Sequence, residues 1–311
     1  MEMRKAYAAA LEKIMREDPR VVTVDADVGK ALGTEKFRDI FGARATDVGI
    51  AEQNMVGVAA GLASYGFKPV CQSFAPFVTR NVCDQICMNL RFTGLKALIV
   101  GADPGISAEL NGASHMATED ISVMRAIPGM QVFEPADDIE LTRALPCLIN
   151  SEDTVYMRMY RKTLPRVHGE DYKFQFGRID VLAEGGDVAL FTSGIFAADA
   201  MKARGILAEK GISSAVVNIH TVKPIDTEGI RRVLSRVKLG VVYENHNECG
   251  GLYSAVAEVN SASPRPRPVY PFGIRDRFGV RGTLEGIKAE LGLTPADLSA
   301  FISGLLDDLV E

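Results

Sequence analysis

The chain has 311 residues, 47% of them hydrophobic and 24% charged, which is the composition of an ordinary globular protein. This length allows two domains, each with a complete core. A net charge of −5 and an isoelectric point near 5.6 argue against a nucleic-acid-binding protein, because such proteins usually carry a basic surface.

The first residues begin directly in a helical pattern, without the apolar core of a secretory signal. No apolar run approaches the roughly 20 residues that span a bilayer. The five cysteines form no C-x-x-C pair and are odd in number, as expected in a reducing compartment. We therefore expect a cytoplasmic protein.

In the first half of the chain, β-branched runs typical of strands alternate with helical stretches. The expected helices cover residues 4–17, a segment that begins at Glu52, 76–92, 119–126 and 137–149. The expected strands cover residues 21–24, 69–73, 97–100, 131–133 and 155–158. This alternation predicts α/β units around a parallel sheet.

A polar, irregular segment then separates a second α/β unit. Its expected strands begin near Asp187 and cover 214–219 and 240–244, and its helices cover 196–210 and 227–236. We predict an α/β protein of two domains with mostly parallel sheets. The predicted domains are residues 1–165 and 185–311, joined by a linker over 166–184.

Glu52 is the first candidate for chemistry. It stands at the start of a helical segment that is apolar and rich in glycine, where no face is obviously suited to water. An ionised carboxylate is rarely buried without a partner, and a buried one is suited to sharing a proton. The alternative is a structural Glu that offsets the helix dipole.

Three motifs in one order carry a family resemblance. Residues 47–54 read Asp-Val-Gly-Ile-Ala-Glu-Gln-Asn, and residues 74–80 read Phe-Ala-Pro-Phe-Val-Thr-Arg. Residues 111–120 read Asn-Gly-Ala-Ser-His-Met-Ala-Thr-Glu-Asp, followed by the Met-Arg-Ala-Ile-Pro-Gly-Met stretch at 124–130. Together they resemble the pyrimidine-binding domain of the transketolase group of thiamin-diphosphate enzymes. The resemblance extends over essentially the whole chain, so that the second half is similar to the transketolase C-terminal domain.

This resemblance implies residues that bind the cofactor. Glu52 would exchange a proton with N1′ of the aminopyrimidine ring and so activate thiamin diphosphate. Phe74 and Phe77 fall where the family's aromatic rings contact that ring, although both are ordinary core residues by type. Asp27 matches a family residue near the cofactor. Arg80 is also expected to bind the cofactor, at a position where full-length transketolases have a tyrosine.

The resemblance also implies substrate contacts. His115 matches the histidine near the sugar carbonyl, and a neutral imidazole is suited to proton transfer near pH 7. Arg4 and Arg158 match arginines that bind substrate phosphate. Asn111 and Asp103 fall at two further substrate positions, where the family usually has an Asp and a His. These departures affect the expected sugar specificity.

The order of the motifs agrees with where ligands bind in open α/β sheets, at the carboxyl ends of the strands. Asp27 follows the strand 21–24, and Phe74 follows 69–73. Asp103 and His115 follow 97–100, and Arg158 lies in or at the end of 155–158. The sequence therefore predicts one site at one edge of the first sheet.

One half of the expected cofactor site is missing from the sequence. Family members hold the diphosphate through Mg²⁺ with a Gly-Asp-Gly motif and a later Asn, and the chain has no Gly-Asp-Gly. The resemblance therefore implies the C-terminal subunit of a split transketolase, paired with a diphosphate-binding subunit in an α2β2 assembly. The implied reaction moves a two-carbon ketol unit from a ketose phosphate to an aldose phosphate through dihydroxyethyl-thiamin diphosphate.

Two other functions share parts of this pattern. The beta subunit of a 2-oxo-acid dehydrogenase's decarboxylating component also carries Gly-Ile-Ala-Glu-Gln, but its loop is usually of a His-Ser-Gln type. A non-catalytic assembly subunit would keep the fold alone. His168 is expected to be solvated in the linker, His220 and His246 to be structural, and the Arg-rich stretch 263–268 to be a stiff surface connection.

Overall fold

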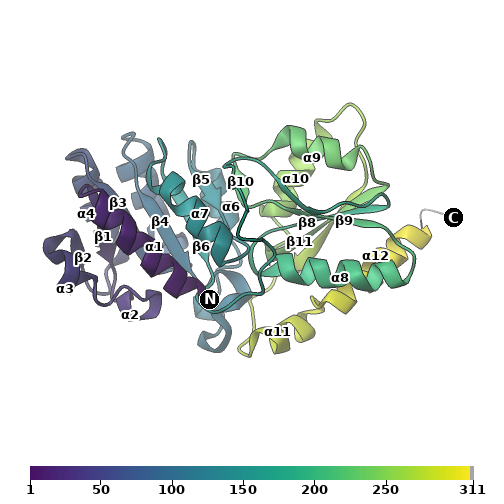
Figure 1. Cartoon of the computed structure of the whole chain (residues 1–311), viewed down its shortest axis with the longest axis horizontal. Helices are drawn as coiled ribbons and strands as arrows, with labels where there is room; N and C mark the ends of the chain where they lie inside the picture. The colour runs from purple at the N-terminus through teal and green to yellow at the C-terminus, as the bar shows by residue number, and fades with distance from the viewer. Residues whose placement is uncertain (309–311) are drawn as a thin grey trace.

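Apolar strands flanked by helices form two sheets that lie side by side in the computed structural model, which describes residues 1–308 (Figure 1). The seven-stranded sheet has the order β10-β5-β6-β4-β3-β1-β2, and the five-stranded sheet has the order β12-β11-β8-β9-β7. All pairings are parallel except those of the edge strands β10 and β7. The predicted α/β fold with two mostly parallel sheets is confirmed.

The strands of the first sheet are short and almost completely buried. They are β1 (Val21–Asp25), β2 (Ala45–Asp47), β3 (Lys68–Phe74), β4 (Leu98–Ala102), β5 (Gln131–Phe133), β6 (Val155–Met159) and β10 (Thr221–Lys223). The strands of the second sheet are β7 (Asp180–Ala183), β8 (Val188–Thr192), β9 (Ser214–Asn218), β11 (Leu239–Asn247) and β12 (Val269–Ile274). Burial on both faces explains their continuous apolar runs.

Helices cover both faces of the sheets and form two cores. The helices are α1 (Met3–Glu17), α2 (Gly29–Leu32), α3 (Phe37–Phe41), α4 (Glu52–Ser64), α5 (Cys83–Gln85), α6 (Asp120–Ala126), α7 (Asp138–Ile149), α8 (Ala197–Glu209), α9 (Thr227–Leu234), α10 (Leu252–Ser261), α11 (Leu284–Leu291) and α12 (Pro295–Asp308). One core contains residues of α1, α7, α8 and α12, and the other contains residues of α4, α6, α9 and α10. None of these helices, within the part of the chain described, is both long and apolar enough to cross a bilayer.

Two strands cross the expected division between the domains. β7 lies inside the segment 166–184 that we predicted as a linker, and it pairs antiparallel with β9. β10 follows β9 in the chain but joins the first sheet beside β5. The second half of the chain therefore completes the edge of the first sheet.

The helix predicted over 76–92 is broken. A turn after β3 leads to the 3₁₀ helix Arg80–Val82, then α5, then a π-helix over Ile86–Arg91. The backbone leaves the helical region at Val82, with φ −130° and ψ 19°. The turn brings Phe77 back to β3, because its backbone N–H donates to the Phe74 carbonyl at 2.9 Å.

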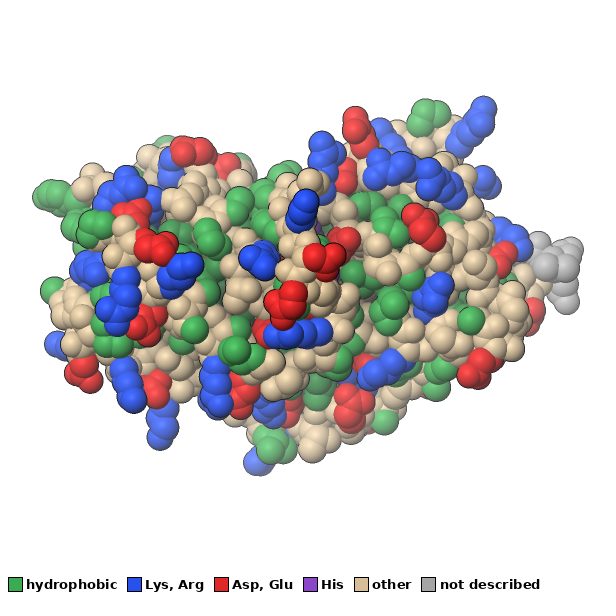
Figure 2. All heavy atoms as spheres, viewed as in Figure 1, with side chains coloured by type: hydrophobic (Ala, Val, Ile, Leu, Met, Phe, Trp, Pro, Cys, Tyr) green, Lys and Arg blue, Asp and Glu red, His purple; other side chains and the backbone are tan. Residues whose placement is uncertain are grey.

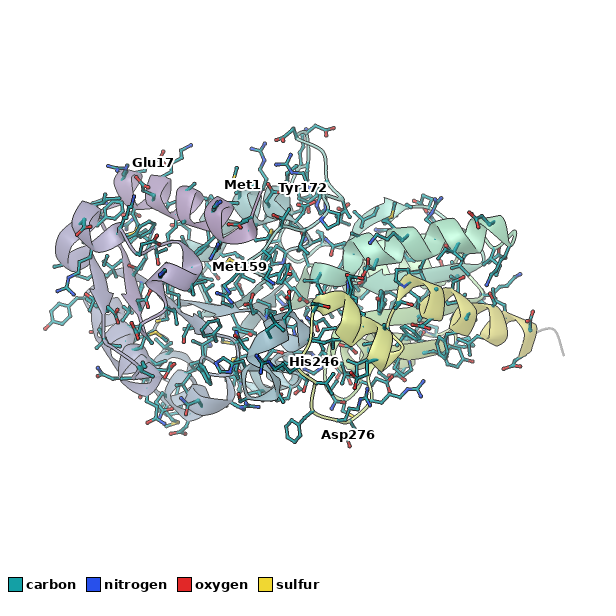
Figure 3. The ribbon with its side chains drawn as sticks, turned by 90° about the horizontal axis from the view of Figure 1, so that it is seen from below. Met1, Glu17, Met159, Tyr172, His246 and Asp276 are labelled. Carbon is teal, nitrogen blue, oxygen red and sulfur yellow. The ribbon has the colours of Figure 1, made fainter. Side chains whose placement is uncertain are left out.

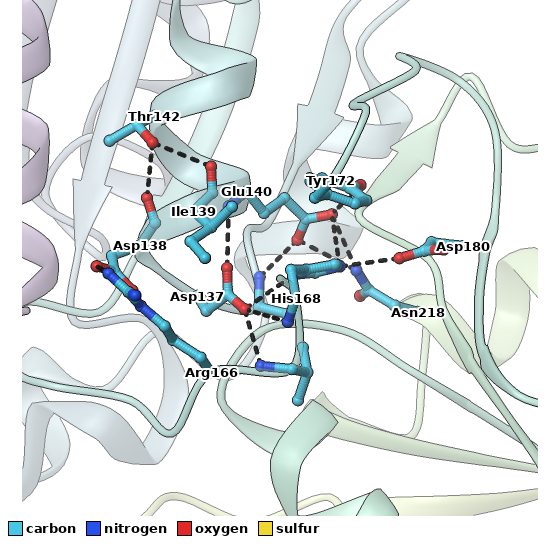
Figure 4. Close-up of polar contacts among 12 residues, drawn as sticks. Asp137, Asp138, Ile139, Glu140, Thr142, Arg166, His168, Tyr172, Asp180 and Asn218 are labelled. Atoms are coloured by element: carbon cyan, nitrogen blue, oxygen red, sulfur yellow. Dashed lines mark hydrogen bonds and ion pairs between the residues drawn. The ribbon is translucent and has the colours of Figure 1, made fainter. Parts of the chain in front are cut away.

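His168 joins the two domains in a buried polar cluster (Figure 4). Its Nδ1 lies 2.9 Å from Asp137 at the start of α7, and its Nε2 lies 2.8 Å from Asp180 in β7. Glu140 accepts hydrogen bonds from Tyr172 at 2.9 Å and from Asn218 in β9 at 3.0 Å. The expectation that His168 is solvated was wrong, because flanking carboxylates from both domains enclose it.

The cluster stabilises a protonated imidazole. Burial alone would lower the pKa of His168, but its bonds to Asp137 and Asp180 outweigh burial and raise the pKa to about 10. Burial would raise the pKa of Asp137, yet His168 and backbone donors bring it down to about 2. Burial raises the pKa of Glu140 to about 7. At neutral pH the cluster therefore contains an ion pair between the domains.

Replacing His168 by Gln should lower the free energy of unfolding by about 3 kcal/mol, because buried carboxylates lose their cation. The folded pKa of His168 is about 10, above the usual 6.5, so its contribution is complete below pH 6.5 and is lost as the pH rises towards 10. Between about pH 8 and about pH 9.5, the free energy of unfolding should fall with pH more steeply in the natural chain than in His168→Gln. The difference should be up to about 1.4 kcal/mol per pH unit.

Urea unfolding at several pH values measures both effects. Glu140 titrates near pH 7 and also lowers stability as it ionises, so the comparison starts above that range. His115→Gln is the control, because no carboxylate pairs with His115 among residues 1–308. If the free energy of unfolding changed equally with pH in the natural chain and in His168→Gln, the proposed ion pair would be contradicted.

Candidate functional site

An aspartate joins the carboxyl ends of β1 and β2. Asp47, the last residue of β2, accepts hydrogen bonds from the backbone N–H groups of Asp27 at 3.1 Å and Gly49 at 2.8 Å. Asp27 is exposed, and both it and Gly49 have positive φ, 58° and 75°. The turn therefore places Asp27 and the chain entering α4 at one edge of the sheet, as expected for a ligand site.

Glu52 is buried at the first position of α4. Its side chain is 8% exposed, and the Ser73 hydroxyl donates to Oε1 at 3.2 Å. Within residues 1–308, no hydrogen bond reaches Oε2. A surface Glu that only offset the helix dipole would face water. Glu52 is instead a shielded carboxylate with one oxygen available to a further donor.

Three rings form a cluster beyond the end of β3. The ring of His115 lies 5.2 Å from Phe77 and 5.7 Å from Phe74, edge to face in both cases. Phe74 and Phe77 are 6.3 Å apart. All three side chains are only half-buried, unlike the core residues that surround them. The cluster is therefore a partly open aromatic surface, which immediately follows the Ser73 that contacts Glu52.

Arg80 positions the loop that carries His115. Its guanidinium donates to Glu119 at 2.8 Å and to the Ser114 carbonyl at 3.2 Å. The Ser114 hydroxyl lies 3.1 Å from Nδ1 of His115. Arg80 was predicted to contact the cofactor directly. Its contacts in the structure support the loop of His115, and its contact with the cofactor stays a prediction.

A partly exposed arginine lies beside the aromatic cluster. Arg161 follows β6, and its guanidinium carbon is 5.0 Å from the centre of the Phe74 ring. Its Nε donates to Asp103 at 2.6 Å. Burial raises the pKa of Asp103, although Arg161 acts in the opposite direction. Asp103 therefore orients Arg161 and is itself enclosed, which argues against its predicted direct contact with substrate.

Arg4 lies next to Arg161. The backbone N–H of Arg4 donates to the Arg161 carbonyl at 3.1 Å, and the Arg4 guanidinium, 37% exposed, pairs with Glu2 at 3.1 Å. Asn111 is exposed at the end of the 3₁₀ segment Gly105–Asn111. The two arginines bring positive charge to the edge of the site, and Asn111 is accessible at the His115 loop.

The structure contradicts the prediction that Arg158 binds substrate phosphate. Its side chain has no exposed surface and forms ion pairs with Asp120 at 2.8 Å and Glu134 at 2.9 Å. Its remaining terminal nitrogen donates to the Asn245 carbonyl at 2.8 Å. A ligand would have to displace buried charged partners, at a cost of several kcal/mol. The contacts of Arg158 in this structure therefore favour a structural role over the predicted contact with phosphate.

Sequence reasoning missed Arg161, Ser73 and Glu119. Arg158 lies within β6, which ends at Met159 near the junction of the domains in Figure 3. A residue just beyond a strand's carboxyl end, such as Arg161, is the better candidate by the rule that ligands bind there. Ser73 and Glu119 carried no such signal, because their partners are distant in sequence.

Two family descriptions match most of the chain. Residues 1–167 match "Transketolase, pyrimidine binding domain", and residues 177–298 match "Transketolase, C-terminal domain".

Relatives of similar length also match along nearly the whole chain. A 6-deoxy-6-sulfo-D-fructose transketolase subunit, SqwH, from Clostridium sp. (strain MSTE9) is 42% identical over 95% of this chain and 92% of the relative. An apulose-4-phosphate transketolase subunit from Phocaeicola vulgatus is 32% identical over 93% of each chain. A solved structure described as "Split gene transketolase, inactive beta4 tetramer" aligns with a TM-score of 0.88 at 36% identity, covering 98% of this chain and 97% of that one.

Proposed function

The chain belongs to the transketolase family, and on that premise we propose that it is the C-terminal subunit of a split transketolase. It transfers a two-carbon ketol unit from a ketose phosphate to an aldose phosphate. The observation that carries this proposal is the buried Glu52 beside the open cluster of Phe74, Phe77 and His115. The family depends on thiamin diphosphate, and these residues fit the aminopyrimidine half of that cofactor.

The side chains of the site suit the aminopyrimidine ring of the cofactor. A planar, partly polar ring is recognised by aromatic faces and by a carboxylate at a ring nitrogen. Phe77 and Phe74 supply the aromatic surface, and Glu52 Oε2 receives no hydrogen bond within residues 1–308. Thiamin diphosphate, when bound, supplies the nucleophilic carbon for ketol transfer. Glu52 holds the proton shared with N1′, and Ser73 keeps the carboxylate oriented.

His115 acts on the sugar. It lies on the same surface as the two Phe rings, and Arg80 and Ser114 fix its loop. A histidine in this position donates a hydrogen bond or a proton to the oxygen of the substrate carbonyl, where negative charge develops.

Arg161 and Arg4 bind the terminal anion of the sugar. The two residues are neighbours, and Asp103 and Phe74 hold the Arg161 guanidinium in one orientation. A forked guanidinium binds the oxygens of a phosphate or a sulfonate in two hydrogen bonds. The names of two relatives include substrates of both kinds, a sulfo-fructose and apulose 4-phosphate.

The other half of the cofactor site belongs to a separate subunit. No group of three or more His, Cys, Asp or Glu side chains that could hold a metal is found among residues 1–308. The proposal assigns Mg²⁺ and the diphosphate to a diphosphate-binding partner in an α2β2 assembly, because the sequence has no Gly-Asp-Gly motif. The relatives named as subunits support this arrangement.

One face of α4 is suited to contact with that partner. Gln53, Asn54, Gly57 and Gly61 are exposed along it, and Ile50 just before the helix is 81% exposed. The sequence suggested that no face of this helix would be suited to water, yet none of residues 1–308 covers the two glycines. The glycines permit close approach of another backbone, and Ile50 adds an exposed apolar side chain beside them.

Glu52→Gln should reduce turnover at least about 100-fold, because an amide cannot share the proton that general acid–base catalysis requires. The measurement is ketol transfer by the complex of this chain with its partner, together with the sedimentation of that complex. Glu35→Gln, at an exposed position, is the control. An unchanged rate with an intact complex would leave only an assembly role for the chain.

Arg161→Lys should raise KM for a phosphorylated ketose by about tenfold, because lysine loses the second hydrogen bond and the contact with Phe74. The value of kcat should change little. A ketose without a terminal anion serves as the matched control substrate, and its KM should not move. Equal effects on both substrates would show that Arg161 does not bind the anion.

Gly57→Gln should prevent association with the partner and leave the isolated chain folded, because an added Cβ meets no atom within 4 Å. Gly205→Gln is the matched control on α8, where the glycine is also exposed and unobstructed. Analytical ultracentrifugation of each variant with the partner measures the effect. Normal assembly of Gly57→Gln would place the partner elsewhere.

A further inference from the structure

A pocket of about 360 Å³ lies in the second domain, away from the candidate active site. Its walls come from the end of α9, the end of α10 and the connection from α10 to β12. These segments meet at the amino ends of the strands of the second sheet, whereas the candidate active site lies at the carboxyl ends in the first sheet. The pocket is within the 300–1,000 Å³ that small-molecule sites usually occupy.

Three arginines line this pocket without any carboxylate. They are Arg231 in α9, and Arg265 and Arg267 in the connection. Among residues 1–308, none of the three forms an ion pair, although the chain as a whole has a net charge of −5. Figure 2 shows Lys and Arg side chains gathered over this part of the molecule, near α9. The pocket is therefore a local concentration of positive charge.

The guanidinium group of Arg231 lacks an acceptor among residues 1–308 for one of its buried hydrogen-bond donors. One terminal nitrogen donates to the Ala262 carbonyl at 3.0 Å, past the end of α10. Its Nε is buried, and no acceptor reaches it within the described chain. A buried donor without a partner is uncommon in native proteins and calls for an explanation. Arg231 therefore lines the pocket with hydrogen-bonding capacity that residues 1–308 leave unused.

The connection that carries the other two arginines is stiff. Pro264, Pro266 and Pro268 fix their own φ angles, and each restricts the conformations open to the residue before it. Asn260 fixes Arg267 by accepting from its backbone N–H at 3.0 Å and donating to its carbonyl at 2.8 Å. Little conformational freedom of this backbone would be lost on binding, which favours affinity.

We propose that this pocket binds a small organic phosphate at a site separate from the one for ketol transfer. The guanidinium groups suit phosphate oxygens, and the Ser263 hydroxyl, which accepts from the Arg265 backbone N–H, keeps its own proton to donate. Leu234 and Pro264 form an apolar wall, which suits the non-phosphate part of the ligand. The ligand class includes sugar phosphates and nucleotides, which share the phosphate group.

Calorimetric titration of the full chain with ribose 5-phosphate, AMP, ATP and inorganic phosphate tests the proposal and separates these sources. At least one organic phosphate should bind with a dissociation constant below about 1 mM, more tightly than inorganic phosphate. The double change Arg265→Ala and Arg267→Ala should weaken that binding at least about tenfold. Ketol transfer by the complex should not change in this variant.

The matched control removes two exposed cations from the first domain, with Lys36→Ala and Arg38→Ala. It changes the net charge equally and should leave the dissociation constant unaltered. Arg231→Gln is a second variant, and it should weaken binding without loss of the folded state. Equal affinity in the natural chain and both pocket variants would overturn the proposal. Tight binding of single-stranded RNA, with none of the small phosphates, would overturn it as well.

Discussion

The arrangement of the site depends on one buried cation at the junction of the domains. Arg158 is completely enclosed, so each of its charged contacts must be satisfied within the protein. It pairs with Asp120 and Glu134 and donates to the backbone of Asn245 in β11. Asp120 begins α6 directly after the His115 loop, and β11 belongs to the second sheet. This cation therefore fixes the loop, the first sheet and the second domain relative to one another.

The contacts between the domains explain how the second domain supports the candidate site, whose side chains come from the first domain. β10 extends the first sheet, and His168 bridges carboxylates of α7 and β7. Ser193 of the second domain donates to Glu134, the same carboxylate that pairs with Arg158. These contacts hold the carboxyl ends of β4 and β6 in place, so that Arg161 lies against Phe74. Rigid support of this kind is what a catalytic arrangement requires.

The candidate site contains groups suited to an aromatic ring and an anion, without a cluster of metal-binding side chains among residues 1–308. It contains a shielded carboxylate, an aromatic surface, an imidazole and two neighbouring arginines, which suit a planar ring and an anionic sugar. Within residues 1–308 it contains no cluster that could hold a metal ion. The exposed face of α4, with its two glycines, is adjacent to Glu52 in the same helix. A protein that docked on this face of α4 would therefore lie close to Glu52.

The sequence by itself determined the features that depend on neighbouring residues. Periodicity located most strands and helices, and local motifs identified Glu52 at a helix start and the Phe74, Phe77 and His115 segments that meet in the fold. Only the tertiary structure showed that Arg158 is enclosed whereas Arg161 is partly exposed, because their burial depends on Asp120, Glu134 and Asp103, which lie far away in the chain. It also decided that His168 is enclosed and that the Arg-rich connection lines a pocket. The burial of a side chain and the partners of its charge depend on residues distant in sequence, so a local sequence pattern does not predict them.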